Sequence, residues 1–237
     1  MAAAANNAEW CDLVCRSHGA NTRLDGDAWT SETRTPALYP DAVTLVPDPS
    51  VPDLLSRIDT SAGCSIKDSF ASLDLSADGF RVLFDARWVV RTSNTSPPDG
   101  AGPARGLLGR PGPRWERVRT PSGLATWEQA WRGGGGPPDV FRAELLDHDS
   151  VAVLAARSGE RVVAGAILNR SSTVVGISNF FAEPHFTPAA WSDCLALAGS
   201  LYPASTFVGY ESGDGLLAAR NHGFETVGPL RAWVHDG

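Results

Sequence analysis

Residues 150–181 read SVAVLAARSGERVVAGAILNRSSTVVGISNFF. Three apolar runs in this stretch have the length of strands and are rich in Val, Ile and Phe, which favour extended structure. The segments between them, Ser158-Gly159-Glu160 and 170–173, are short and polar, as turns between antiparallel neighbours are. The expected strands lie at 150–157, 161–169 and 174–181. The stretch is therefore predicted to be a three-stranded antiparallel meander.

The residues on either side of the meander alternate between helical and extended patterns. Thr120 is in position to cap a helix, and Gly223 is in position to end one. Trp191 and Cys194 lie on the apolar face of a helical repeat. The expected helices lie at 121–131, 187–201 and 216–221, and the expected strands at 115–119, 207–210 and 226–234.

This order of elements resembles the GNAT superfamily of acyltransferases, in which a meander leads into a central helix and a parallel strand pair splays apart to admit the acyl donor. The nearest local match is Ala218-Ala219-Arg220-Asn221-His222-Gly223-Phe224, which is similar to the family's late helix and its Gly-Phe ending. The resemblance covers residues 114–237. It implies a mixed, mainly antiparallel α/β (α+β) sheet, twisted and flanked by helices.

A turn-rich segment separates this domain from the first half of the chain. Residues 94–113 contain many Pro and Gly residues without a hydrophobic period, so we interpret them as a linker. The elements expected in residues 1–93 are a helix at 8–18 that begins at Asn6 or Asn7, a strand at 41–46, a short helix at 52–58 and a strand at 80–90.

The first half also repeats a pattern of the second. Residues 65–70 followed by Gly79-Phe80 parallel residues 208–213 followed by Gly223-Phe224, and 43–46 parallel 174–177. We interpret this as a degenerate internal duplication, with chance similarity as the alternative. The first half is then a truncated GNAT-like unit, as in tandem members of the superfamily.

The resemblance implies an acyl-coenzyme A donor beside Phe180, Phe181 and Ala182, but the residues that follow do not match the family. GNAT proteins hold the pyrophosphate of the donor on a Gly-rich turn at the start of the central helix. Residues 182–189 contain no Gly or Arg, one acid, and two prolines that lack an N–H. The family's usual general-acid tyrosine is replaced by Ala219. Coenzyme A binding is therefore doubtful, and no metal is expected.

Polar residues remain where the splayed strands are expected to meet. Tyr210 and Glu211 are the catalytic candidates, because a phenol and a carboxylate there can relay a proton. Asn179 and Asp214 are candidates for binding the substrate. The alternative for Glu211 and Asp214 is that they favour the N-terminus of the following helix.

Lys67 and Asp68 occupy the matching positions in the first half, so they are expected to face Tyr210 and Glu211 across a pseudo-twofold cleft. A desolvated Lys67 is a third catalytic candidate, as a base or an amine nucleophile, and Asp68 a candidate for substrate binding. The alternative is a structural contact. Asn169 is a further candidate for binding a carboxylate or amide of the substrate, unless it only supports a turn.

Composition limits the partners. The net charge of −7 is spread along the chain without a dense Lys/Arg cluster, so nucleic acid is not an expected partner. No apolar run approaches the length of a membrane span, and four scattered cysteines fit a reducing compartment, so we expect a cytoplasmic monomer or homodimer. Cys11, Cys15 and His18 share one side of a helix, where packing is a better explanation than a zinc site.

Three functions are compatible with these features. The first is an acyltransferase that moves an acyl group to an amine of a small molecule or peptide. The second is a coenzyme A-independent enzyme on a tandem GNAT fold, with another acyl carrier or with proton-transfer or lyase chemistry. The third is a non-catalytic binding protein that keeps the cleft.

Overall fold

The computed structural model describes residues 1–93, 112–135, 138–172 and 174–237. The helices are α1 (Ala2–Ser17), α2 (Val51–Ser56), α3 (Pro121–Trp131), α4 (Thr187–Leu201) and α5 (Gly213–Asn221). The strands are β1 (Thr22–Leu24), β2 (Ala28–Ser31), β3 (Ala42–Thr44), β4 (Ser65–Asp68), β5 (Phe80–Arg91), β6 (Arg114–Val118), β7 (Val151–Ser158), β8 (Arg161–Arg170), β9 (Val175–Ala182), β10 (Phe207–Glu211) and β11 (Glu225–His235). The predicted linker lies almost entirely outside the described residues.

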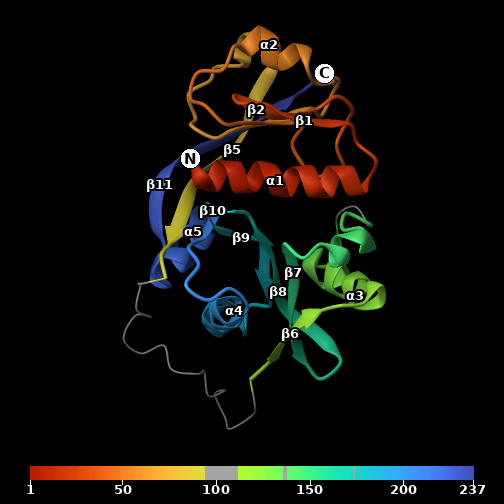
Figure 1. Ribbon diagram of the computed structural model, residues 1–237, viewed down its shortest axis with the longest axis vertical. Coiled ribbons are helices and arrows are strands. Elements are labelled where there is room, and N and C mark those ends of the chain that lie inside the picture. The colour runs from red at the N-terminus through yellow and green to blue at the C-terminus, as the bar shows by residue number, and fades with distance from the viewer. Residues whose placement is uncertain (94–111, 136–137, 173) are drawn as a thin grey trace.

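All of these strands belong to one sheet, in the order β1-β2-β3-β4-β11-β5-β10-β9-β8-β7-β6. Its pairs are antiparallel except for β3 with β4 and β9 with β10, which are parallel, among the residues that the structure describes. The mainly antiparallel α/β architecture predicted from the sequence is confirmed, and helices flank the sheet (Figure 1).

The predicted meander is β7, β8 and β9, paired in sequence order. Its middle strand is buried along nearly its whole length because both faces of the sheet are covered. Val153 and Ile167 on one face pack in a cluster with residues of α1 and α3. Leu154 and Leu168 on the other face pack with residues of α4 and α5. This alternation follows from the period of two along a strand.

The centre of the sheet joins the two halves of the chain. Strand β5 of the first half lies between β10 and β11, while β11 of the second half lies between β5 and β4. The registers match across this centre, because Asp68 pairs with Arg231 as Glu211 pairs with Arg87. Each half therefore places one strand inside the other half's part of the sheet (Figure 1).

The N-terminal helix differs from the prediction. Helix α1 begins at Ala2, and Asn6 and Asn7, expected to start it, are buried inside it. The four preceding alanines have the highest helix propensity, so the helix extends back through them. The two asparagines instead form tertiary hydrogen bonds: Asn6 Nδ2 donates to the carbonyl of Asn169 at 3.0 Å, and Asn7 Oδ1 accepts from Lys67 Nζ at 3.2 Å.

Candidate functional site

A cavity of about 240 Å³ lies where β9 and β10 separate, beneath α1. The two strands pair only at Val175 with Phe207 and at Gly176 with Val208, and they diverge after these positions. The cavity is lined by the diverging segments of β9 and β10 together with the N-terminal half of α1, Tyr39 and Lys67. The splayed parallel pair expected from the sequence is therefore present, and side chains from both halves of the chain close it.

Asn179 marks a bulge in the wall of this cavity. The register between β8 and β9 shifts there, from Gly165 opposite Phe181 to Ile167 opposite Ser178. The backbone of Asn179 has φ of +53°, an uncommon conformation that asparagine tolerates better than most residues. Such bulges turn a strand locally and redirect its side chains. Asn179 thus lies at the cavity as predicted, with its amide donating to Ser178 Oγ at 3.1 Å.

Glu211 is the only carboxylate lining the cavity among the described residues. Burial of its side chain raises the pKa of Glu211 from 4.5 to about 7. Its carboxyl lies against the first turn of α5, where a Cβ at Gly215 would lie 2.5 Å from Glu211 Oε2. Because a group with a pKa near neutrality exchanges protons readily, Glu211 is suited to general acid/base chemistry.

Lys67 reaches the same cavity from the first half of the chain. Its side chain is only 9 % exposed, and its Nζ lies 4.7 Å from the centre of the Tyr210 ring. Burial lowers the pKa of Lys67, but Tyr210, Cys11 and Cys15 act in the opposite direction, and the net pKa is raised. Lys67 and Tyr210 therefore meet across the centre of the sheet, whereas Asp68, expected beside them, does not line the cavity with Glu211.

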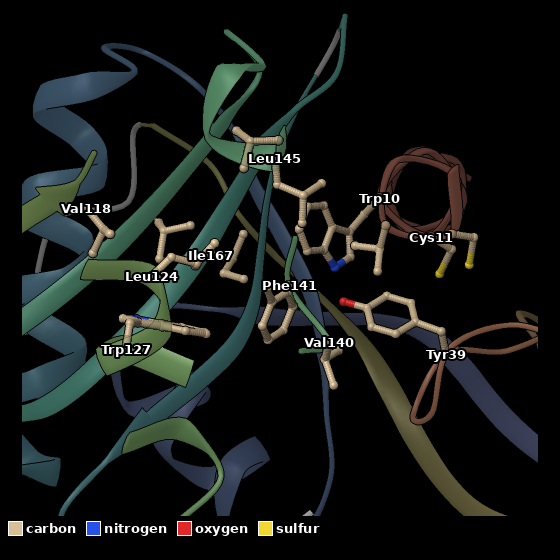
Figure 2. Packing of buried hydrophobic residues seen from close by; sticks show 14 of the residues in the cluster. Trp10, Cys11, Tyr39, Val118, Leu124, Trp127, Val140, Phe141, Leu145 and Ile167 are labelled. Carbon is tan, nitrogen blue, oxygen red and sulfur yellow. The ribbon is translucent and has the colours of Figure 1, made fainter. Parts of the chain in front are cut away.

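Tyr39 also lines the cavity, and sequence reasoning missed it. Its hydroxyl is buried and forms no hydrogen bond of good geometry within the described structure, although the side chains of Asn179 and Trp10 lie near enough to lower its pKa. Burial raises the pKa of Tyr39 well above its ordinary value, so the phenol is neutral. Figure 2 shows this hydroxyl directed toward Trp10 and Phe141, inside the apolar cluster below α1.

Four of the other predicted site residues do not line the cavity. Asp68 is fully buried and accepts backbone N–H groups of Phe70 and Leu73, away from the cavity lining. Asp214 is exposed in the first turn of α5. Phe181 packs edge-on against Trp127, and Ala182 lies beside it on the outer part of β9.

Asn169 and Phe180 remain at the cavity. The amide of Asn169 donates to the backbone carbonyl of Asn6 at 3.1 Å and holds α1 over the sheet. A Cβ at Gly176 would lie 2.0 Å from Asn6 Oδ1, so only glycine allows this close approach. Phe180 stacks on Trp191 at a ring distance of 4.1 Å.

The start of α4 does not fit a pyrophosphate. Its N-cap is Phe186, without a side-chain cap, and a proline occupies the first positions of the helix. Glu183 places an acid at this turn, and its carboxylate forms an ion pair with Arg161. An anion would meet few free N–H groups and one carboxylate there.

The residues that the structure describes offer neither a cluster of metal ligands nor a helix that could span a membrane. No group of three His, Cys, Asp or Glu side chains is placed to hold a metal ion, and Cys11 and Cys15 are fully buried by packing. No described helix combines the length and apolarity that crossing a membrane would need.

The meander, the splayed strand pair beside it and the following helix α4 together define the GNAT fold. Solved structures share this fold over almost the whole chain. A GCN5-related N-acetyltransferase from Kribbella flavida superposes with a TM-score of 0.65 at 15 % identity, covering 99 % of this chain and 96 % of that one. A GCN5-related N-acetyltransferase-like protein from Streptococcus suis 89/1591 gives 0.51 at 14 % identity, with 96 % and 98 % covered.

A conserved protein of unknown function from Staphylococcus epidermidis ATCC 12228 is also similar, with a TM-score of 0.59 at 12 % identity and coverage of 92 % and 94 %. No protein-family model matches the sequence, and no curated protein matches it either. At these identities the likeness establishes the fold. It includes the first half of the chain, since the coverage is nearly complete.

Proposed function

We propose that this protein is an acyltransferase that moves an acyl group to the amine of a small molecule. The observation that supports this most directly is Glu211, a carboxylate with a pKa of about 7 at the cavity where the strand pair opens. An amine attacks an acyl group only as the free base, so a nearby proton acceptor of this pKa promotes the attack. GNAT acetyltransferases among the similar structures are in line with this chemistry.

The proposed step uses residues of both halves. Glu211 accepts a proton from the amine while the nitrogen forms a bond to the acyl carbon. The bond between that carbon and the leaving group breaks, and the leaving group takes its electron pair. Tyr210 donates a proton to the leaving group and regains one from solvent, and Glu211 returns its proton to solvent. Lys67 lies 4.7 Å from the Tyr210 ring and favours negative charge on the phenol during this transfer.

The acyl carrier is proposed to be something other than intact coenzyme A. Glu183 and the proline-containing start of α4 do not offer the N–H groups that a diphosphate needs. A thioester that lacks the nucleotide, or one attached to another carrier, needs no such site. This separates the proposed function from that of a GNAT enzyme that depends on its pyrophosphate turn.

We also propose that the chain arose by tandem duplication of a GNAT unit. The two parallel pairs, β3 with β4 and β9 with β10, are each short and each adjoin the exchanged strands β5 and β11. The matching registers of Asp68 and Glu211 support the same origin. A single chain then contains both units that form the cleft, so the cleft is complete in a monomer and in each subunit of a homodimer.

The test measures acyl transfer to a panel of small amines, with acetyl-coenzyme A and a short acetyl thioester of N-acetylcysteamine as alternative donors. We expect acyl transfer from the short thioester. The KM for acetyl-coenzyme A should be no lower than the KM for the short thioester, because the nucleotide part is not bound. Glu211→Gln should lower the rate at an unchanged melting temperature or a raised one. Full activity in Glu211→Gln would exclude the proposed role of this carboxylate, and a tenfold lower KM for the coenzyme would show that its diphosphate is bound.

A further inference from the structure

The cavity contains a buried cation without a carboxylate partner. Lys67 is over nine-tenths buried, and no Asp or Glu forms an ion pair with it among the described residues. Its contacts are Asn7 Oδ1 and the face of the Tyr210 ring. The nearest acidic residue in sequence, Asp68, instead accepts hydrogen bonds from the backbone N–H groups of Phe70 and Leu73. Buried ammonium groups are normally paired, so this one is suited to an anion supplied from outside.

A second buried group lacks a partner in the same cavity. The Tyr39 hydroxyl, on a side chain only 8 % exposed, forms no hydrogen bond of good geometry within the described structure, and its polar neighbours are the side chains of Asn179 and Trp10. A buried hydroxyl without a partner costs free energy, and a bound ligand oxygen would supply one. Lys67 and Tyr39 are independent observations, since they come from different segments and both line the space beneath α1.

The second ionisable group in the cavity is the carboxyl of Glu211, whose charge is opposite in sign to that of Lys67. Among its described lining residues, Lys67 is the one cation and Glu211 the one carboxylate, and the two do not form an ion pair. A volume of about 240 Å³ corresponds to about eight water molecules at about 30 Å³ each. This is room for a small organic acid or amino acid.

A second cavity of about 300 Å³ also borders Lys67 and Tyr210, and it is lined by the loop before β3, by β4 and by residues of β5 and β11. Leu83 and Phe84 line it and are 49 % and 36 % exposed, so it opens to solvent through apolar side chains. Lys67, Tyr39 and Tyr210 border both cavities. A ligand held at Lys67 can therefore place an apolar group in this second space.

We propose that the acceptor is a small amino acid with an apolar side chain, whose carboxylate binds Lys67 and the Tyr39 hydroxyl while its amine points toward Glu211. The amine part of this inference rests on the proposed function, whereas the carboxylate site stands on the cavity alone. Asn7 holds the Lys67 ammonium in place, so the helix α1 forms part of the recognition.

The first experiment needs no variant. The melting temperature of the protein is measured with L-leucine and L-phenylalanine, with the matched amines 3-methylbutylamine and 2-phenylethylamine, and with the matched acid 4-methylpentanoate. We expect the amino acids to raise the melting temperature and the amines, which lack the carboxylate, to have no effect at equal concentration. Equal shifts with amines and amino acids, or no shift with any amino acid, would overturn the proposal.

Variants then test the residues. Lys67→Met should weaken binding of the responding amino acid roughly ten- to hundredfold by calorimetry, because a hydrogen bond to a charged group is lost. Tyr39→Phe should weaken binding less. Because it removes only a hydroxyl, this variant still tests the site if Lys67→Met does not fold. Arg81→Met, which removes an exposed arginine paired with Asp236, is the matched control and should bind normally. Unchanged affinity in both Lys67→Met and Tyr39→Phe would refute the site.

The outcomes also separate this site from the proposed function. Amino acid binding that depends on Lys67, without acyl transfer from any donor, would remove the acyltransferase and keep the carboxylate site. Acyl transfer to amines that lack a carboxylate, with no amino acid binding, would keep the acyltransferase and remove the carboxylate site.

Discussion

Glu211 allows a sharp test, because its burial affects the stability of the fold as well as the chemistry. In the unfolded chain this carboxyl ionises near pH 4.5, whereas in the folded protein it stays protonated to about pH 7. Between these values the folded state binds more protons than the unfolded state, so the free energy of unfolding falls as the pH rises. At about 1.4 kcal/mol per pKa unit, the loss reaches about 3 kcal/mol above pH 7.

Glu211→Gln cannot ionise and should escape this loss. Its stability relative to the parent protein should therefore grow from pH 4.5 to pH 8 by up to about 3 kcal/mol, or about 6 to 12 °C in melting temperature for a chain of this length. Urea unfolding at closely spaced pH values measures the difference directly. Glu225→Gln, at an exposed position on β11, is the control and should show a difference that does not vary with pH. Parallel pH curves for Glu211→Gln and the parent would refute the desolvation of Glu211.

Three further substitutions test other contacts. Gly215→Ala should displace the Glu211 carboxyl, because the new Cβ would lie 2.5 Å from Oε2, and should lower acyl transfer while leaving the melting temperature within a few degrees; unchanged activity would argue against the position assigned to Glu211. Trp127→Phe removes the donor to the Leu154 carbonyl, at 2.7 Å in the core, and should cost about 2 kcal/mol in urea unfolding. Asp68→Ala should cost about 2 to 3 kcal/mol, since one buried and one partly buried N–H group lose their acceptor, with no change in amino acid binding; weaker binding would support Asp68 as a substrate residue.

The second half of the chain was the easier part to predict. Helices 121–131 and 187–201 have the expected bounds, and Thr120 caps the first of them through a hydrogen bond from the Gly123 N–H at 3.1 Å. These elements combine a strong period with clear start and stop residues, so local patterns define them. The short strands β1 and β2 have three or four residues and no period of their own, and they exist only because β3 offers them an edge.

The site was partly predictable for a related reason. Tyr210, Glu211 and Lys67 follow from the strand ends and from the repeat within the chain. Asn7 and Tyr39 did not, because their roles depend on where α1 and the loop before β3 pack. One signal was present: two asparagines after four alanines are poor residues for a helix interior, and their burial has to be supported by tertiary hydrogen bonds.

The exchange of β5 and β11 determines when the fold can form. Strand β11 follows every other strand along the sequence, yet it lies in the middle of the sheet, between β4 and β5. During synthesis β4 and β5 of the first half therefore keep an unpaired edge until the residues of β11 leave the ribosome. Folding cannot be completed domain by domain from the N-terminus, and the partly made chain exposes strand edges that other chains can pair with. The cleft between the halves thus exists only once the whole sheet has closed.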